Sequence, residues 1–163
     1  MYNNKGFTLM EIIIVVALIG ILTAISIPVI KPMIASQRIS SAAQSVRSAL
    51  QRAKTEAIKN QTTATVTFIA GTGSAASYST SLAEGTIIGT TSGTLSSTVQ
   101  MYNVAFGTPP ANTVQFNSLG LATGFAGEVR FTDADNTIFK SVNITNSGNI
   151  TILKSTTDGS FVE

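Results

Sequence analysis

The pattern of apolar and polar positions changes three times along the chain. A short polar segment, 1–6, precedes a long apolar run at 7–30, in which Glu11 is the only charged residue. An α-helix rises about 1.5 Å per residue, so a run of this length nearly spans the hydrocarbon core of a bilayer. The pattern therefore predicts a transmembrane helix over 7–30.

Beyond residue 30, the apolar positions recur in steps of three and four. This spacing is typical of an amphipathic helix with a narrow apolar face, and Lys59 suits a helix end near Asn60. We expect a helical stem over 31–60, whose mostly small apolar residues allow a sheet to pack close to it. The apolar face consists of Ile39, Ala43, Val46, Leu50, Ala53 and Ala57, widened by Ala42, Ala49 and Ile58.

Two prolines, Pro28 and Pro32, lie within this otherwise continuous helical pattern. A proline in a helix interior removes a hydrogen bond and kinks the axis, at a cost of roughly 3 kcal/mol. We therefore expect both prolines to interrupt the helix.

From residue 61 the apolar period becomes two, which predicts a β-rich head over 61–163 and an α+β fold with a mostly antiparallel sheet. The expected strands are 63–69, 77–81, 86–88, 99–106, 114–117, 128–132, 138–144 and 150–153, with a flexible loop at 90–98. Five phenylalanines would be poorly covered by a single short sheet, so we expect two sheets or one strongly bent sheet. They are Phe68, Phe106, Phe116, Phe131 and Phe139.

The composition argues against enzyme chemistry. The chain has no cysteine and no histidine, which removes thiolate chemistry, disulfides and the commonest general base and metal ligand. A serine nucleophile would need a lysine as its base, and no spacing suggests such a pair. We expect no enzymatic activity, no cofactor and no metal.

Two short motifs imitate ligand sites. The glycines at 71–76 follow a strand like a dinucleotide-binding turn, but the residues after them favour strand or loop over the required helix. The acidic residues at 133–136 could hint at calcium, which needs six to eight oxygens. Too few acids follow to complete such a site, so we interpret 133–136 as a hairpin turn.

The net charge of +2 conceals an asymmetry between stem and head. Residues 31–59 contain six cations and one acid, whereas residues 60–163 contain three cations and six acids. A charged run of this kind is usually a solvated helix face, and the sharper alternative is contact with acidic partners or phosphates.

The segment from Lys5 to Glu11, with the sequence KGFTLME, resembles the processing site of type IV pilins and type II secretion pseudopilins. The resemblance implies that a prepilin peptidase removes the leader, 1–6, by cutting between Gly6 and Phe7, and that the new amine of Phe7 is methylated. It also implies that Glu11 pairs with the N-terminal amine of a neighbouring subunit during assembly. An ordinary signal peptide is the alternative, but such a peptide rarely carries an acid in its apolar core.

Three further stretches narrow the resemblance to the GspH/FimT minor pseudopilins. They are 46–61, which contains AKTEAIKN, then 116–120 and 147–150. In pilins a proline stands at the place of Pro28, and the segment from Gly20 to Pro28 is the expected site of local melting in assembled filaments. Pro32 departs from that pattern.

The resemblance implies a structural function in a lollipop-shaped subunit. We expect a minor pseudopilin of the type II secretion pseudopilus, and a minor type IV pilin stays open as the alternative. The implied partners are other pilins or pseudopilins, prepilin peptidase and inner-membrane lipid. The N-terminus would lie in the cytoplasm and the head in the periplasm, although Lys31 and Arg38 after the apolar run favour the opposite orientation by the positive-inside rule.

DNA capture is the second alternative. Family members that bind DNA use a Gly-Arg-x-Arg element, and the matching residues, 120–123, have the uncharged sequence GLAT. An acidic head also repels phosphate, so the sequence argues against DNA as a partner.

Overall fold

The computed structural model describes residues 7–83, 93–108 and 111–155, with the side chains of 25–29 and of Thr94 excepted. The chain forms two compact units, 1–34 and 35–163, which are described separately below. The expected strand at 86–88 lies outside the described residues.

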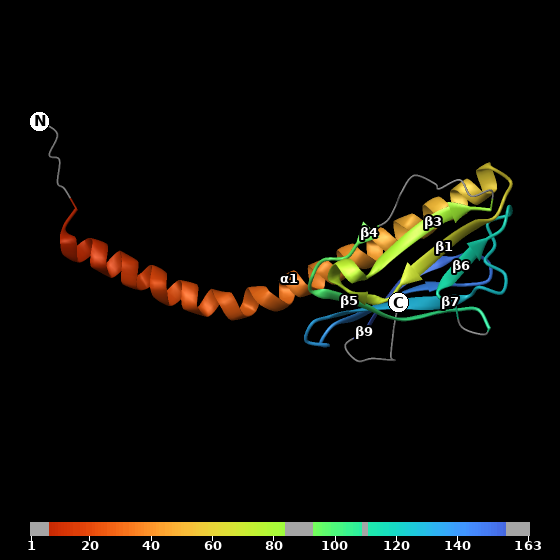
Figure 1. Ribbon diagram of the computed structural model, residues 1–163. Helices are drawn as coiled ribbons and strands as arrows, with labels where there is room; N and C mark the ends of the chain where they lie inside the picture. Colours follow the sequence, from red (N-terminus) through yellow and green to blue (C-terminus); the bar gives the residue numbers. More distant parts are fainter. Residues whose placement is uncertain (1–6, 84–92, 109–110, 156–163) are drawn as a thin grey trace, which may run out of the picture. The chain divides into compact units, whose positions relative to one another are not determined.

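One helix, α1 (Leu9–Lys59), contains all of the expected helical segments. The prediction that Pro28 and Pro32 interrupt it is wrong, because the helix is continuous through both positions and through Gly20 (Figure 1). Each proline removes a single hydrogen bond, and the long helical ladder on either side retains the rest. Local melting of this segment in a filament stays a prediction.

The first unit consists of the start of α1. Its apolar side chains from Phe7 to Leu22 are exposed on all faces of the helix. Among the residues that the structure describes, no helix is long and apolar enough to cross a membrane.

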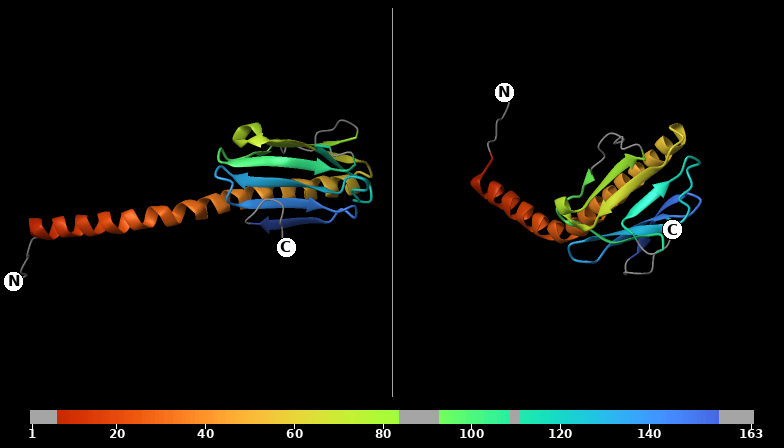
Figure 2. Two further views of the ribbon diagram at one scale, coloured as in Figure 1. Left: turned by 90° about the horizontal axis from the view of Figure 1, so that it is seen from below. Right: turned by 45° about the vertical axis from the view of Figure 1, so that its right-hand side comes forward.

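In the second unit, α1 packs on two antiparallel sheets (Figures 1 and 2). One sheet has the order β4-β3-β1-β6 and the other β2-β5-β7-β8-β9. The first contains β1 (Ala64–Ile69), β3 (Ser77–Leu82), β4 (Gly93–Thr94) and β6 (Thr113–Phe116). The second contains β2 (Gly71–Thr72), β5 (Val99–Phe106), β7 (Gly127–Asp133), β8 (Phe139–Ile144) and β9 (Ile150–Ser155). The α+β fold and the two sheets are confirmed.

The helix face toward the sheets is the predicted one, with one exception. Eight of its nine expected residues are buried, whereas Ile58 is 46% exposed. The prediction for Ile58 is wrong because this position lies about 100° around the helix from Ala57, which is fully buried, and therefore outside the face that packs on the sheets. All five phenylalanines are buried, and Phe68 of β1 stacks on Phe106 of β5 at 5.5 Å, which joins the two sheets.

Two connections between strands were predicted only in part. The expected loop at 90–98 contains the short strand β4, which pairs with β3 through Tyr78 and Gly93. The glycine-containing segment 71–76 forms β2 and the short 3-10 turn η1 (Gly73–Ala75) before β3 begins. The helix that a dinucleotide-binding turn requires does not follow it.

The turn at 133–136 is confirmed as a hairpin connection between β7 and β8. Asp133 closes it, because its carboxylate accepts hydrogen bonds from the Thr137 and Ile138 backbone amides at 2.7 and 3.0 Å and from the Thr137 hydroxyl at 2.6 Å. Burial alone would raise the pKa of Asp133, but these hydrogen bonds outweigh it and leave the pKa below its ordinary value. The Asp133 carboxylate, which the sequence offered as a calcium ligand, is therefore hydrogen-bonded within the turn itself.

Candidate functional site: the helix start and the helix-to-head junction

Thr8 caps the start of α1. Its hydroxyl oxygen accepts a hydrogen bond from the Glu11 backbone amide at 3.2 Å, and its carbonyl accepts from the amides of Glu11 and Ile12. This is the N-cap arrangement that satisfies backbone donors left free at a helix start. This role of Thr8 was not among the predictions, although the spacing of Thr8 and Glu11 matches the Thr-x-x-Glu capping box.

Glu11 lies on the first turn of α1 and is exposed. A carboxylate is favoured there by the helix dipole. Within the part of the chain that the structure describes, no hydrogen-bond donor reaches this carboxylate. The geometry leaves Glu11 available to a cation from another molecule, which suits the expected pairing without testing it.

The expected cleavage site lies between Gly6 and Phe7, directly before the start of α1. Phe7 is 82% exposed, and Gly6 lies outside the described residues. Cleavage between Gly6 and Phe7 stays a prediction.

A second cluster, the head junction, brings together Lys54, Gly120 and Gly148 from the three stretches that carry the resemblance. The Lys54 ammonium donates a hydrogen bond to the Gly148 carbonyl at 2.8 Å. Both glycines have positive φ, 75° and 73°. A Cβ on Gly120 would lie 2.8 Å from Ile58 Cδ1 and 2.9 Å from Lys54 Cε, and a Cβ on Gly148 would collide with the Gly120 carbonyl oxygen.

Two asparagines fix the loop that contains Gly120. The Asn117 side-chain oxygen accepts hydrogen bonds from the Leu119 and Leu121 amides at 3.0 and 2.9 Å. The Asn146 carbonyl accepts from the Ala122 amide at 3.0 Å. The junction therefore ties the end of α1 to both the β6–β7 loop and the β8–β9 turn.

No cluster of three or more metal-ligating side chains occurs among residues 7–83, 93–108 and 111–155. The head junction is built from backbone carbonyls, glycines and one lysine, and it holds no arrangement of nucleophile and base. Its geometry is that of a structural joint.

Comparisons with known proteins agree with this geometry. Residues 1–27 match the family model of the prokaryotic N-terminal methylation motif, and residues 42–148 match that of type II transport protein GspH. The fimbrial protein EcpB of Eikenella corrodens is 50% identical over 40 residues, which are 24% of this chain and 25% of that protein. This match thus spans only a quarter of the relative's length.

Two crystal structures of the type IV minor pilin FimU of Pseudomonas aeruginosa share the fold. One has a TM-score of 0.54 at 18% identity and covers 72% of this chain and 89% of that one. The other has a TM-score of 0.50 at 17% identity and covers 69% and 90%. At this level of identity the likeness shows the fold alone.

A methylation motif at the start of a long helix, followed by an antiparallel head, defines the pilin-like class of proteins. The match over 42–148 covers well over half of the sequence, and the chain belongs to the GspH family of type II transport proteins.

Proposed function

We propose that this chain is a minor pseudopilin, a structural subunit of a type II secretion pseudopilus that takes part in protein secretion. The observation that carries the proposal is the combination, on one chain, of the N-terminal methylation motif and the GspH-family head. Neither the head junction nor the helix start supplies catalytic groups, which suits a structural subunit.

The proposal includes a division of the chain into four segments. Residues 1–6 are a leader that prepilin peptidase removes, and 7–30 are the anchor in inner-membrane lipid and the assembly helix. Residues 31–60 are the stem and 61–163 the head. The methylation motif supports the anchor, because the pilins that carry it are held in the membrane by this helix. The proposed topology is single-pass, with the N-terminus in the cytoplasm and the head in the periplasm.

In the assembled state, α1 packs among the helices of other pilins or pseudopilins. The exposed apolar side chains from Phe7 to Leu22 suit either lipid or such neighbours. Glu11 then pairs with the methylated amine of an adjacent subunit, since a carboxylate in an apolar bundle needs a cation.

A minor type IV pilin is the second candidate. The FimU fold and the short match to a fimbrial protein favour it. Deletion of the gene, with complementation by the wild-type copy, separates the two. Loss of exported protein from the medium with normal surface pili supports the pseudopilus, and normal export with lost pili or DNA uptake supports the pilus.

Direct DNA capture by residues 120–123 is not proposed. This loop is uncharged, and its backbone is held by Asn117 and Asn146. It therefore offers phosphate no cation.

A further inference from the structure

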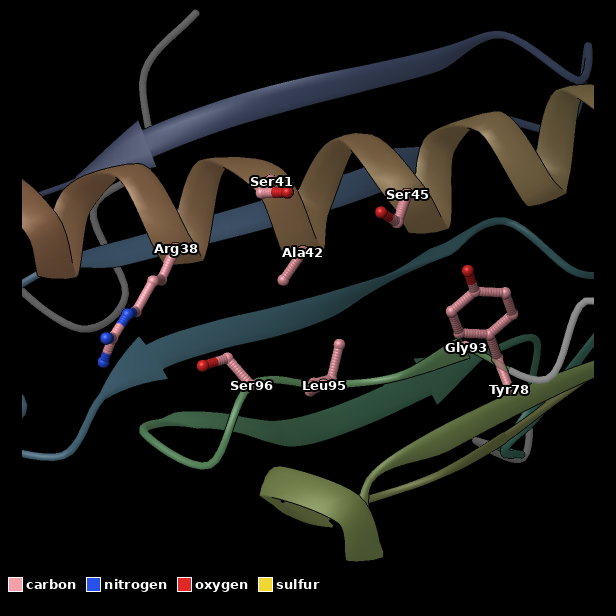
Figure 3. Close-up of a pocket in the computed structure, with 8 residues that line it drawn as sticks. All are labelled: Arg38, Ser41, Ala42, Ser45, Tyr78, Gly93, Leu95 and Ser96. Carbon is pink, nitrogen blue, oxygen red and sulfur yellow. The ribbon is translucent and has the colours of Figure 1, made fainter.

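A polar groove follows one side of α1 in the second unit. It consists of two adjoining hollows of about 190 and 440 Å³, which share Ser41, Ser45 and Tyr78 as lining residues. The remaining lining residues are Arg38, Ala42, Gly93, Leu95 and Ser96 in the first hollow and Gln44, Ser48, Ala49 and Arg52 in the second. Figure 3 shows the first hollow between α1 and the segment that contains β4.

Tyr78, a largely buried residue, lines both hollows at the point where they meet. The residue is only 4% exposed, yet its hydroxyl has no hydrogen-bond partner within the described ranges. Figure 3 shows the hydroxyl directed toward α1, near Ser45. Gly93 packs so closely on the Tyr78 ring that a Cβ there would collide with it, so the ring is held in place. The hydroxyl reaches the groove without a partner from the described part of the protein, so it is available to hydrogen-bond a polar ligand.

The two ends of the groove are positively charged. Arg38 and Arg52 are fourteen positions apart on one helix, which is about 21 Å along its axis. The Arg38 guanidinium donates a hydrogen bond to the Thr98 hydroxyl at 3.0 Å, which holds it beside the groove and leaves other donors free. None of the described residues that line the two hollows is acidic.

Between the arginines, the groove offers groups that both donate and accept hydrogen bonds. Ser41, Ser45 and Ser48 contribute hydroxyls, and Gln44 contributes an amide. A peptide backbone alternates donors and acceptors and matches such a surface. Single-stranded nucleic acid instead needs a cation for most phosphates and exposed aromatic faces for stacking, and the Tyr78 ring is buried.

We propose that this groove binds an extended acidic segment of a partner protein, with one carboxylate at Arg38 and another at Arg52. At about 3.3 Å per residue, the two carboxylates would stand about six residues apart. The Tyr78 hydroxyl and the serines between them would bind the partner's backbone. This proposal goes beyond the structural function above and does not depend on which filament the chain joins.

The test uses the full chain in detergent micelles and a fluorescein-labelled peptide of alternating serine and threonine with aspartate at positions 1 and 7. Fluorescence anisotropy at low salt measures its binding. We expect Arg38→Gln or Arg52→Gln to weaken binding about two- to fivefold, as for a single exposed ion pair, and the double variant about tenfold. Tyr78→Phe, which removes only the hydroxyl, should also weaken it.

Arg47→Gln is the matched control, because Arg47 is exposed on the same helix and does not line the groove. It should leave the affinity unchanged. A peptide with aspartates at positions 1 and 4 should bind more weakly than the original, and the analogue with asparagine at positions 1 and 7 should bind about tenfold more weakly, like the double variant. Thermal unfolding followed by circular dichroism verifies that each variant is folded.

Three results would overturn the proposal. They are failure of the peptide to bind the wild-type chain, equal losses in the Arg47 and Arg38 variants, and tighter binding of a single-stranded oligonucleotide that competes at Arg38 and Arg52. None of them bears on the secretion and piliation phenotypes of the deletion strain, so the two proposals fail separately.

Discussion

The Lys54 ammonium donates a 2.8 Å hydrogen bond to the carbonyl of Gly148, a residue 94 positions further along the chain. This contact joins the last turns of α1 to the turn between β8 and β9. It places a charged donor at a carbonyl in the turn between β8 and β9, and it holds the C-terminal end of the helix against this turn of the second sheet.

Replacing Lys54 with methionine tests the strength of this contact. Methionine keeps the long side chain but removes the ammonium, so we expect the free energy of unfolding to fall by about 1.5–3 kcal/mol, the range for hydrogen bonds to charged groups. Urea unfolding of the two proteins measures the difference. Arg47→Met, on an exposed part of the same helix, should cost less than about 0.5 kcal/mol. Equal losses in both variants would contradict a specific role for Lys54.

The glycines of the head junction give a second prediction. Gly120→Ala and Gly148→Ala each add a Cβ at a positive φ and also force it onto neighbouring atoms. Gly124→Ala is the matched control, because Gly124 has a φ of 80° with nothing within 4 Å of its Cβ position. Gly124→Ala should lose about 1–2 kcal/mol from the backbone alone, and the other two should lose more. Thermal unfolding would contradict this if all three lost the same amount.

Asp133 should make the stability of the head depend on pH. Its folded pKa is lowered from the ordinary 3.8, so the unfolded chain binds the proton more tightly than the folded one. The carboxylate's contribution is therefore complete above about pH 3.8 and is lost as the pH falls through the lower, folded pKa.

Asp133→Asn removes this titration but keeps the shape of the side chain. We expect it to cost about 1 kcal/mol near pH 7, because a charged acceptor becomes a neutral one. The difference from wild type should shrink as the pH falls below 3.8. A difference between Asp133→Asn and wild type that stays constant between pH 7 and 3 would exclude this role of the carboxylate.

The strands and the buried helix face were predictable because each follows a local rule. Alternation along 99–106 and 128–132 predicted β5 and β7 closely, and the steps of three and four along α1 predicted its buried face. Ile58 is the exception because it lies about 100° around the helix from the buried Ala57, outside that face. The rule that a proline interrupts a helix failed at Pro28 and Pro32, because the hydrogen bonds of the long flanking helix outweigh the single bonds lost there.

The head junction could not be predicted as a contact. Its three stretches stand out in the sequence only because they resemble the GspH/FimT family. Nothing in the sequence near Lys54 indicates a hydrogen bond to a carbonyl 94 residues away. The groove could not be predicted for the same reason. Tyr78 lies near Ser41 and Ser45 only once the chain has folded and β3 packs beside α1. Thr8, by contrast, could have been assigned from its spacing to Glu11.

Gly6→Ala tests the proposed processing. A small side chain at the residue before the cut should block prepilin peptidase, so the precursor should keep its leader and the methyl group should be missing. Mass spectrometry of the intact protein from membranes reports both changes. Ser26→Ala, inside the proposed anchor, should be processed normally. A mature N-terminus at Phe7 in the Gly6→Ala protein would refute the assignment.

Glu11→Ala separates assembly from processing. The variant should be cleaved and methylated, because the cut between Gly6 and Phe7 is several residues away. It should enter sheared filaments poorly, because a neighbour's amine is then left without its carboxylate in an apolar bundle.

Thr8→Ala is the control for local helix structure, since it removes the cap at the Glu11 amide but keeps the carboxylate. That change should cost about 1 kcal/mol of helix stability and leave incorporation near normal. Immunoblots of sheared filaments measure both variants. If Glu11→Ala enters filaments as well as wild type, or if Thr8→Ala is equally defective, the ion pair is not what holds the subunit in place.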